Sequence, residues 1–228
     1  MGDAFRDRVV VVTGGTGALG RAVVARLVED GAAPLVTYRS DRELGESMLP
    51  ERVPASRVDV GDERAVAEFY RGAGNVWASV HLVGAFKMAP VLDTSADDFR
   101  RMFEVNAMTC FLCCREAVRA MGGAGGRIVN VGARPAAQPV GGMVAYSASK
   151  AAVASVTQSL AEELKADGIL VNAVLPSVMD TPANRAAMPA ADYSNWPKVE
   201  EVAEAIAFLI SPANTLTTGA LLTVYGRA

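Results

Sequence analysis

The sequence predicts one α/β domain built on a doubly wound parallel sheet of about seven strands, with helices on both faces. Short runs rich in β-branched residues alternate along the chain with longer amphipathic stretches. The short runs are apolar at successive positions, which is typical of strands buried on both faces. Such strands occur in parallel sheets, because the helices that connect parallel strands cover the sheet from both sides.

Seven short segments have the composition of buried strands. Residues 8–13, RVVVVT, hold four consecutive valines after a charged N-terminal stretch. The others are bounded by Gly, Pro or polar residues, which end a strand or turn the chain. The predicted strands are residues 8–13, 33–39, 55–60, 76–84, 126–132, 169–176 and 219–226.

Longer segments with helical periodicity lie between these strands. The first ends at Gly31, and the third begins at a run of Ser and Asp residues that caps a helix. The predicted helices are residues 18–31, 63–71, 95–121, 145–168 and 197–211. The irregular segment at about residues 176–198 is predicted to be a short substrate flap.

Length and composition fit a single domain over residues 1–228. About half of the residues are hydrophobic (51%), and no repeat or linker interrupts them. The formal net charge is −3 without a basic block, so nucleic acids and anionic membranes are not expected as partners. The N-terminus lacks a signal-peptide pattern, and no apolar run reaches the roughly 20 residues that cross a bilayer. A cytoplasmic location is expected.

The three cysteines, Cys110, Cys113 and Cys114, cluster in one predicted helix. Three closely spaced cysteines are not a disulfide framework or a ligand set, and with His81 as the only histidine no metal site is expected. We expect the cysteines in the core or at a subunit interface, and His81 as a structural residue at the end of a strand.

The first predicted strand is followed by TGGTGALG at residues 13–20. Gly15, Gly17 and Gly20 have the G-x-G-x-x-G spacing and lie between a strand and a helix, within a βαβ unit of about 30 residues. Glycines let the backbone approach a pyrophosphate, and the helix N-terminus presents unpaired N–H groups to it. The pattern predicts a Rossmann-type fold that binds a dinucleotide.

The end of the second strand indicates which dinucleotide is preferred. A carboxylate about 20 residues after the glycines would bind the adenosine ribose of NAD(H), but this chain has Arg39 and Ser40 there. A guanidinium forms bidentate, charge-assisted hydrogen bonds with a phosphate, which predicts NADP(H) as the preferred cofactor. NAD(H) stays possible, because Asp41 would serve as the ribose acceptor if the loop shifts.

Tyr146 and Lys150 lie four residues apart in AYSASK, at the start of a long predicted helix. Residues at this spacing share a helix face, with about 6 Å of rise between them. A nearby ammonium favours the phenolate, so the pKa of Tyr146 is predicted to fall from about 10 towards neutrality. Tyr146 would then be the general acid for a carbonyl or imine that receives hydride.

These motifs resemble the short-chain dehydrogenase/reductase family along nearly the whole chain. The matching segments are TGGTGALG, VDVGDE with Asp59, VNA with Asn106, YSASK, and VNAVLPSVMDTP. The resemblance implies that Tyr146 is the acid/base, that Lys150 also holds the nicotinamide ribose, and that Asn106 anchors a water of the proton relay. It also implies that Asp59 lies beside the adenine and Thr181 at the carboxamide.

The resemblance and the glycine loop together give the residues expected at the cofactor. They are Gly14, Gly15, Thr16, Gly17, Ala18, Leu19, Gly20, Arg39, Ser40, Asp59, Val60, Val83, Gly84, Tyr146, Lys150, Pro176, Val178 and Thr181. The family pairs subunits through two long helices, so we expect a homodimer or homotetramer formed through residues 95–121 and 145–167.

The chain departs from the family pattern at four places. Ala18 replaces a glycine of the loop, HLVG at 81–84 replaces NNAG, Ser177 replaces a glycine, and Ala133 replaces the serine expected about 13 residues before the tyrosine. In a ketone reductase that serine helps to hold the carbonyl oxygen as negative charge develops on it. Its absence favours a substrate that needs less oxyanion stabilisation.

Within the family, the chain most resembles the quinonoid dihydropteridine reductases. The resemblance rests on the glycine loop, on alanine at the serine position, and on residues 175–196, LPSVMDTPANRAAMPAADYSNW. It implies a small conjugated C=N or C=O substrate that regains conjugation on taking hydride. Two features differ: that branch resembles NADH users with an acidic residue where this chain has Arg39, and Asn106 follows the broader family.

The residues expected to contact the substrate are Ala133, Gln138, Met143, Met188, Tyr193 and Trp196. Gln138 and Met143 precede Tyr146, and the last three lie in the predicted flap, which would close over a flat substrate and exclude water. For Tyr193 and Trp196 the alternative, packing of the flap against the body, stays open.

The leading functional hypothesis is therefore an NADPH-dependent reductase of a small conjugated substrate. A generic carbonyl reductase or alcohol dehydrogenase, in which Gln138 or a water replaces the serine, is the second. The third is a nucleotide-binding regulatory or scaffold protein that has lost catalysis. Ala133 favours the third hypothesis, whereas Tyr146, Lys150 and Asn106 argue against it.

Overall fold

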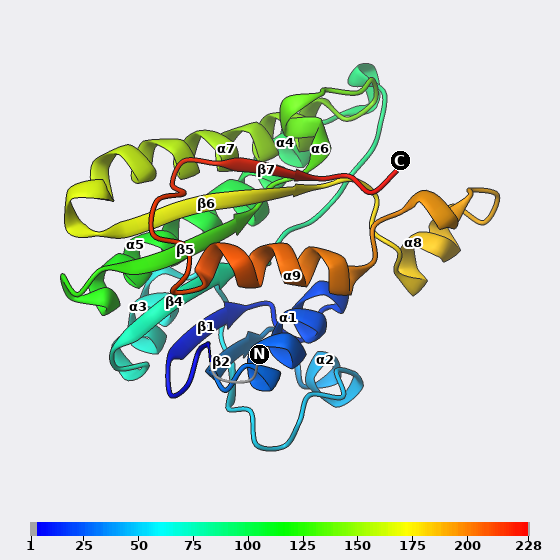
Figure 1. Ribbon diagram of the computed structural model, residues 1–228. Helices are drawn as coiled ribbons and strands as arrows, with labels where there is room; N and C mark the ends of the chain where they lie inside the picture. Colours follow the sequence, from blue (N-terminus) through cyan, green and yellow to red (C-terminus); the bar gives the residue numbers. More distant parts are fainter. Residues whose placement is uncertain (1–3, 228) are drawn as a thin grey trace.

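The computed structural model, which describes residues 4–227, contains a seven-stranded parallel sheet with the order β3-β2-β1-β4-β5-β6-β7 (Figure 1). The strands are β1 (Val9–Thr13), β2 (Ala33–Tyr38), β3 (Ala55–Arg57), β4 (Val76–His81), β5 (Gly126–Val131), β6 (Ile169–Pro176) and β7 (Leu221–Val224). All seven predicted strands are confirmed. The chain reverses its winding direction between β1 and β4, and ligands of doubly wound sheets bind at the carboxyl ends of the strands on either side of such a point.

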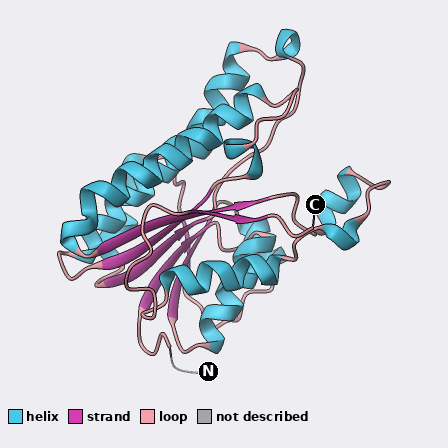
Figure 2. Ribbon diagram, turned by 45° about the horizontal axis from the view of Figure 1, so that its top comes forward, coloured by secondary structure: helices cyan, strands magenta, loops and turns pink. Residues whose placement is uncertain are grey.

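Helices cover both faces of this sheet (Figure 2). They are α1 (Ala18–Glu29), α2 (Asp41–Glu46), α3 (Glu63–Gly72), α4 (Ala96–Met102), α5 (Thr109–Met121), α6 (Arg134–Ala137), α7 (Val144–Leu164), α8 (Pro182–Ala187) and α9 (Val199–Ile210). Short 3₁₀ turns lie at Val91–Asp93, Lys165–Asp167 and Tyr193–Asn195.

The valine run of β1 divides its side chains between two apolar cores. Val10 and Val12 pack with α1 and α9 on one face, whereas Val11 packs with α3, α5 and α7 on the other. All three are fully buried, as expected for a strand in the middle of a parallel sheet. Burial on both faces fixes the position of the strand end, and so of the glycine loop that follows it.

The helix predicted over residues 95–121 is interrupted. Between α4 and α5 the chain forms a π-helical turn, Phe103–Met108, which contains Asn106. Such turns are frequent at functional sites, because the extra residue changes the direction of the side chains. Nothing in the apolar periodicity indicated it.

The predicted flap at 176–198 is partly helical. It contains α8 and the turn Tyr193–Asn195, and a parallel bridge between Asp180 and Lys198 joins its two ends. Both views show it projecting from the edge of the sheet, apart from α7 (Figures 1 and 2). Within residues 4–227, no helix has both the length and the apolar character needed to cross a bilayer.

Candidate active site

The glycine loop between β1 and α1 folds tightly on itself. Gly14 has a φ of 71°, and its N–H donates to Thr37 Oγ1 of β2 at 3.2 Å. Gly17 is the N-cap of α1, and no side chain caps the first turn. Because uncapped N–H groups at a helix N-terminus bind anions, this loop fits the pyrophosphate of a dinucleotide.

Gly20 is the position in this loop that admits no side chain. A Cβ at Gly20 would lie 2.5 Å from Gly14 O and 2.5 Å from Gly15 Cα. A Cβ at Gly17 would meet nothing closer than 3.5 Å, an ordinary contact distance. Gly20 therefore allows α1 to pack directly on the loop, whereas Gly17 leaves space in front of the helix.

Gly20→Ala is expected to lower the free energy of unfolding by about 3 kcal/mol, because backbone atoms of the loop oppose the added methyl group. NADPH binding should weaken with it, since the displaced loop is the predicted pyrophosphate site. Gly17→Ala is the matched control, with a loss of less than about 1 kcal/mol expected at an N-cap glycine. Urea unfolding measures both, and equal losses in the two variants would contradict the packing argument.

A cavity of about 860 Å³ opens at the carboxyl ends of β1, β2 and β4. Eight of the residues predicted at the cofactor line it: Gly14, Thr16, Gly17, Arg39, Asp59, Val60, Val83 and Gly84. They come from four separate segments of the chain, so the fold brings them together as the sequence motifs predict. The cavity has the position and the volume expected for a dinucleotide site.

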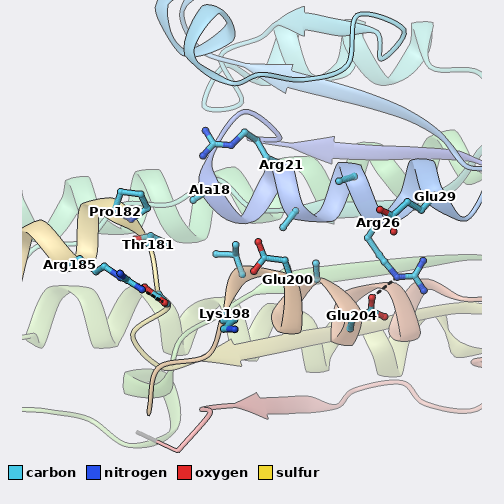
Figure 3. Close-up of a pocket in the computed structure, with 15 residues that line it drawn as sticks. Ala18, Arg21, Arg26, Glu29, Thr181, Pro182, Arg185, Lys198, Glu200 and Glu204 are labelled. Carbon is cyan, nitrogen blue, oxygen red and sulfur yellow. Dashed lines mark hydrogen bonds and ion pairs between the residues drawn. The ribbon is translucent and has the colours of Figure 1, made fainter. Parts of the chain in front are cut away.

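A second cavity of about 860 Å³ lies between α1, α8 and α9 (Figure 3). Its wall includes Ala18 and Thr181, two further residues predicted at the cofactor, and Arg21 lines both cavities. Arg26 points at Glu204, with Nε 2.6 Å from Oε1. The predicted cofactor residues are thus divided between two cavities that share Arg21.

Eight of the predicted cofactor residues line neither cavity: Gly15, Leu19, Gly20, Ser40, Tyr146, Lys150, Pro176 and Val178. Leu19 is buried in the core, and a Cβ at Gly15 would lie 2.7 Å from a Val36 methyl group. Pro176 ends β6, and Val178 follows it. Gly15, Leu19 and Gly20 therefore support the loop from the side of the core. The spacing of the motif could not distinguish this role from direct contact with the cofactor.

The end of β2 places Arg39 in the wall of the cavity at the carboxyl ends of β1, β2 and β4. The Arg39 N–H donates to Glu43 Oε2 at 3.1 Å, and Ser40 Oγ caps α2 by accepting the Glu43 N–H at 3.4 Å. Asp41, the alternative ribose acceptor, lies 3.6 Å from Arg57 and does not line the cavity. Glu43 does line it. Sequence reasoning missed Glu43 because α2 was not predicted.

Tyr146 and Lys150 lie in the first two turns of α7. Lys150 is buried, and its Nζ donates to Val131 O at 2.8 Å, which fixes the ammonium at the end of β5. The Tyr146 ring is half-buried and packs edge-on against Phe86, with ring centres 4.9 Å apart. An ammonium has three hydrogens, so Lys150 retains donors for a ribose after bonding Val131.

The pKa values of this pair differ from the prediction. Burial raises the pKa of Tyr146 to about 12, and desolvation lowers the pKa of Lys150 to about 8. The expected lowering of the Tyr146 pKa by Lys150 is wrong for the protein without cofactor, because desolvation governs both groups. At pH 7 the phenol is protonated, which is the form that gives a proton to a substrate.

Asn106 ties the segment after β4 to α7. Its amide nitrogen donates to Ala85 O and to Ser149 Oγ, both at 3.0 Å, and its Oδ1 accepts the Ala85 N–H at 2.9 Å. Both amide hydrogens are therefore used by the protein itself. The side chain acts here as a positioning group, and its role in anchoring a water remains a prediction.

Gly84 lies where the cavity at the carboxyl ends of β1, β2 and β4 meets two of the predicted catalytic residues. A Cβ there would lie 2.7 Å from Asn106 Oδ1 and 3.2 Å from Lys150 Nζ. The glycine lets the backbone after β4 pass between these side chains and the cavity, so the fold brings Asn106, Lys150 and the predicted cofactor residues to one place.

The predicted substrate residues are not brought together in the same way. Ala133 is buried at the start of α6, and its methyl group offers no hydrogen bond where the family has a serine. Gln138 is exposed, and its Oε1 accepts from Arg134 Nε at 3.0 Å. Met143 is the N-cap residue of α7, three positions before Tyr146.

The three flap residues pack on one another instead. The Tyr193 and Trp196 ring centres are 5.0 Å apart, and the Tyr193 hydroxyl donates to Met188 O at 3.1 Å. In this structure the flap is held by its own contacts and stands away from α7 (Figure 2). The substrate contacts predicted for Met188, Tyr193 and Trp196 therefore stay a prediction that requires the flap to move.

An apolar rim beside Tyr146 was missed in the sequence. The loop between β4 and α4 exposes Phe86, Met88, Val91 and Leu92 by 59, 58, 69 and 95%. An Ala89 N–H to Gly142 O bond of 2.8 Å holds this loop against the segment before α7. The signal was AFKMAPVL, directly after HLVG. Its apolar residues have no helical or strand period, and only the fold places the first of them, Phe86, against Tyr146.

Known proteins share this fold and much of this sequence. Residues 8–192 match the family model described as short chain dehydrogenase. The cis-4-hydroxycyclohexanecarboxylate dehydrogenase of Sinomonas cyclohexanicum is 36% identical, with coverage of 99% of this chain and 98% of that protein. The cyclic-di-GMP-binding biofilm dispersal mediator protein of Escherichia coli K12 is 33% identical, with 98% coverage of both.

Solved structures agree with these matches. A short-chain type dehydrogenase/reductase from Mycobacterium ulcerans superposes with a TM-score of 0.91, at 26% identity and coverage of 98% of this chain and 90% of that one. The structure of BdcA in complex with NADPH gives a TM-score of 0.86, at 32% identity and coverage of 98% of this chain and 95% of that one. The chain therefore belongs to the short-chain dehydrogenase family and is an NAD(P)-dependent oxidoreductase.

Proposed function

We propose that this protein is an NADP(H)-dependent reductase of a small, flat, conjugated C=N or C=O compound. The observation that carries the proposal is the surrounding of Tyr146. Phe86, the first residue of the exposed apolar loop, packs on the Tyr146 ring, and a buried methyl group, Ala133, stands where a second hydroxyl donor is expected. Such a site suits an apolar acceptor whose reduced form needs little oxyanion stabilisation.

The roles of the chain's own groups follow from their positions. A nicotinamide held in the cavity at the carboxyl ends of β1, β2 and β4 would supply the hydride that the acceptor carbon takes. Tyr146, protonated at neutral pH, donates its phenolic proton to the acceptor nitrogen or oxygen. Lys150, held by Val131 O, binds the nicotinamide ribose and, as a cation, stabilises the phenolate that remains. Asn106 holds the backbone at Ala85 through two hydrogen bonds and so fixes this part of the cavity wall.

Quinonoid dihydropterins are the first acceptors to test, because the sequence resembles the reductases that use them. None of the relatives described above carries that name, so this substrate rests on the apolar rim and on Ala133. A panel of quinonoid dihydropterin, quinone and simple ketone, assayed by NADPH oxidation, tests the class. Turnover of ketones in preference to both conjugated acceptors would contradict the proposal.

A second candidate is the oxidation of a hydroxyl group or reduction of an unconjugated ketone. The Sinomonas relative supports it, since its name describes a dehydrogenase of a hydroxycyclohexane carboxylate.

A nucleotide-binding regulatory role is the third candidate, and the Escherichia coli relative, named for binding cyclic-di-GMP, supports it. The same panel separates them, because the regulatory candidate predicts no turnover of any acceptor.

Arg39→Ala is expected to raise the KM for NADPH by roughly 10- to 100-fold and to change the KM for NADH little, because the lost bonds join a guanidinium to the 2′-phosphate. Arg42→Ala is the matched control: Arg42 is exposed on α2, is paired with Glu46 and lies outside the cavity. A parallel rise for both cofactors in Arg39→Ala would contradict the proposed preference for NADP(H).

We also propose a homodimer or homotetramer formed through α4, α5 and α7. Phe99 and Phe111 on this helical run are 39 and 41% exposed, and Phe99 stacks on Phe103 at the surface. A second copy of the chain would cover these side chains. The three cysteines are free and buried within the chain, which fits a reducing, cytoplasmic environment and assigns them to the core.

A further inference from the structure

Three metal-ligand side chains meet between the sheet and α5. His81 ends β4, and Cys110 and Cys114 lie one turn apart on α5. One ring nitrogen of His81 and the two Sγ atoms all lie within 4.8 Å of one another, and the three residues are buried. The cysteine spacing gave no reason to expect this group, because the fold brings Cys110 and Cys114 to a histidine that is distant in sequence.

We propose that His81, Cys110 and Cys114 form a zinc site that clamps the end of β4 to α5. Tetrahedral zinc binds cysteine sulfur at about 2.3 Å and histidine nitrogen at about 2.0 Å, which puts adjacent N and S ligand atoms roughly 3.5 Å apart. Cys114 Sγ lies 3.5 Å from His81 Nδ1, so this edge of the tetrahedron already exists.

A fourth donor lies beside this group. Asn130 Oδ1, from β5, lies 2.8 Å from His81 Nδ1 and 3.4 Å from Cys114 Sγ. Its orientation is fixed, because Asn130 Nδ2 donates to Thr157 Oγ1 at 2.9 Å and Thr157 in turn donates to Val153 O at 2.8 Å. The group therefore offers one nitrogen, two sulfurs and one oxygen, the number of donors that tetrahedral zinc requires.

The histidine is supported on its other side. His81 Nε2 lies 2.8 Å from Ser79 Oγ and 3.3 Å from Tyr70 OH, and these two hydroxyls are 2.7 Å apart. A hydroxyl donates or accepts as required, so the ring can move its proton from Nδ1 to Nε2 and still have a partner. Metal-bound histidines are commonly fixed in this way through the second nitrogen.

Charge balance favours zinc over a monovalent ion. Binding converts the two thiols to thiolates, forms two Zn–S bonds, one Zn–N bond and one Zn–O bond, and releases two protons to solvent. The imidazole stays neutral, so Zn²⁺ and two thiolates sum to zero. A neutral centre suits a site in which Cys114 is 0%, His81 4% and Cys110 6% exposed. Proton release also means that binding tightens as the pH rises.

The test is to refold the full-length chain with and without Zn²⁺ and to measure bound zinc by mass spectrometry after desalting. Refolding is needed because the ligands are buried. The wild type is expected to retain one zinc per chain and to gain about 5 °C or more in Tm. Cys110→Ser and Cys114→Ser should retain close to none, with NADPH binding reporting that they are folded.

Cys113→Ser is the matched control, because Cys113 is equally buried on the same helix but its thiol faces Thr13 and Tyr70. It should retain zinc as the wild type does. Refolding the wild type with Cd²⁺ gives a second readout that needs no variant, the ultraviolet thiolate-to-metal charge-transfer band. The proposal is overturned if the wild type retains no zinc, if it loads Cu⁺ and excludes Zn²⁺, or if zinc is lost equally from Cys113→Ser.

Discussion

Tyr146→Phe is expected to lower kcat for NADPH-dependent reduction by roughly 10²- to 10⁴-fold, the range that a positioned general acid contributes. The substitution removes the phenolic oxygen and keeps the ring that packs on Phe86 at 4.9 Å. Because the phenol is held protonated by burial, the wild type carries a transferable proton at pH 7, and the variant does not. Stopped-flow measurement of NADPH oxidation with the preferred acceptor of the panel gives the ratio.

Two measurements separate the loss of a proton donor from a loss of structure. NADPH affinity, measured by fluorescence, should change little, because Lys150 remains anchored on Val131 O and the substitution leaves the glycine loop unchanged. Substrate KM should also change little if the phenol acts mainly in the transition state. A variant that keeps more than about a tenth of the wild-type kcat would contradict the role of Tyr146 as general acid.

The strands and the main helices could be predicted because each satisfies its burial locally. The valines of β1 alternate between two cores, and any sequence with that run would be read as a buried strand. The helices α2 and α8 were missed because they have six residues each and no buried side chain, so no apolar stripe marks them. Short exposed helices depend on their caps, here Ser40 and Thr181, and on the strands that carry them.

The site could be predicted as a set of residues but not as an arrangement. Spacing along the chain identified Tyr146 and Lys150, which share one helix face. It did not reveal that Phe86 packs edge-on against the Tyr146 ring or that Asn106 is occupied by Ala85, since these contacts join the loop after β4 to other segments of the chain. The predicted lowering of the Tyr146 pKa was wrong because burial raises it instead. Desolvation depends on tertiary packing, which the periodicity of a sequence does not describe.

Lys150→Met is expected to raise the free energy of unfolding at pH 7 by about 2 kcal/mol while abolishing most activity. Burial lowers the pKa of Lys150 from 10.5 to about 8. At about 1.4 kcal/mol per pKa unit, keeping the ammonium charged in the fold costs roughly 3 kcal/mol. Its hydrogen bond to Val131 O returns about 1 kcal/mol, and methionine loses both effects.

The pH dependence identifies the cause. Between the folded pKa of about 8 and the unfolded value of 10.5, the unfolded chain holds a proton on Lys150 that the folded chain has lost. Stability of the wild type from this group therefore rises with pH across that window, and the advantage of Lys150→Met should shrink between pH 8 and 10.5.

Urea unfolding of both proteins at pH 7 and pH 10 tests this, with Lys165→Met as the matched control. Lys165 lies just beyond the end of α7, is 58% exposed and pairs with Glu162 at the surface, so its replacement should change stability by less than about 0.5 kcal/mol. A Lys150→Met protein less stable than the wild type at pH 7 would show that the bond to Val131 O outweighs desolvation. In that case Lys150 would stabilise the fold as well as act at the cofactor, and keeping it would cost the protein no free energy of unfolding.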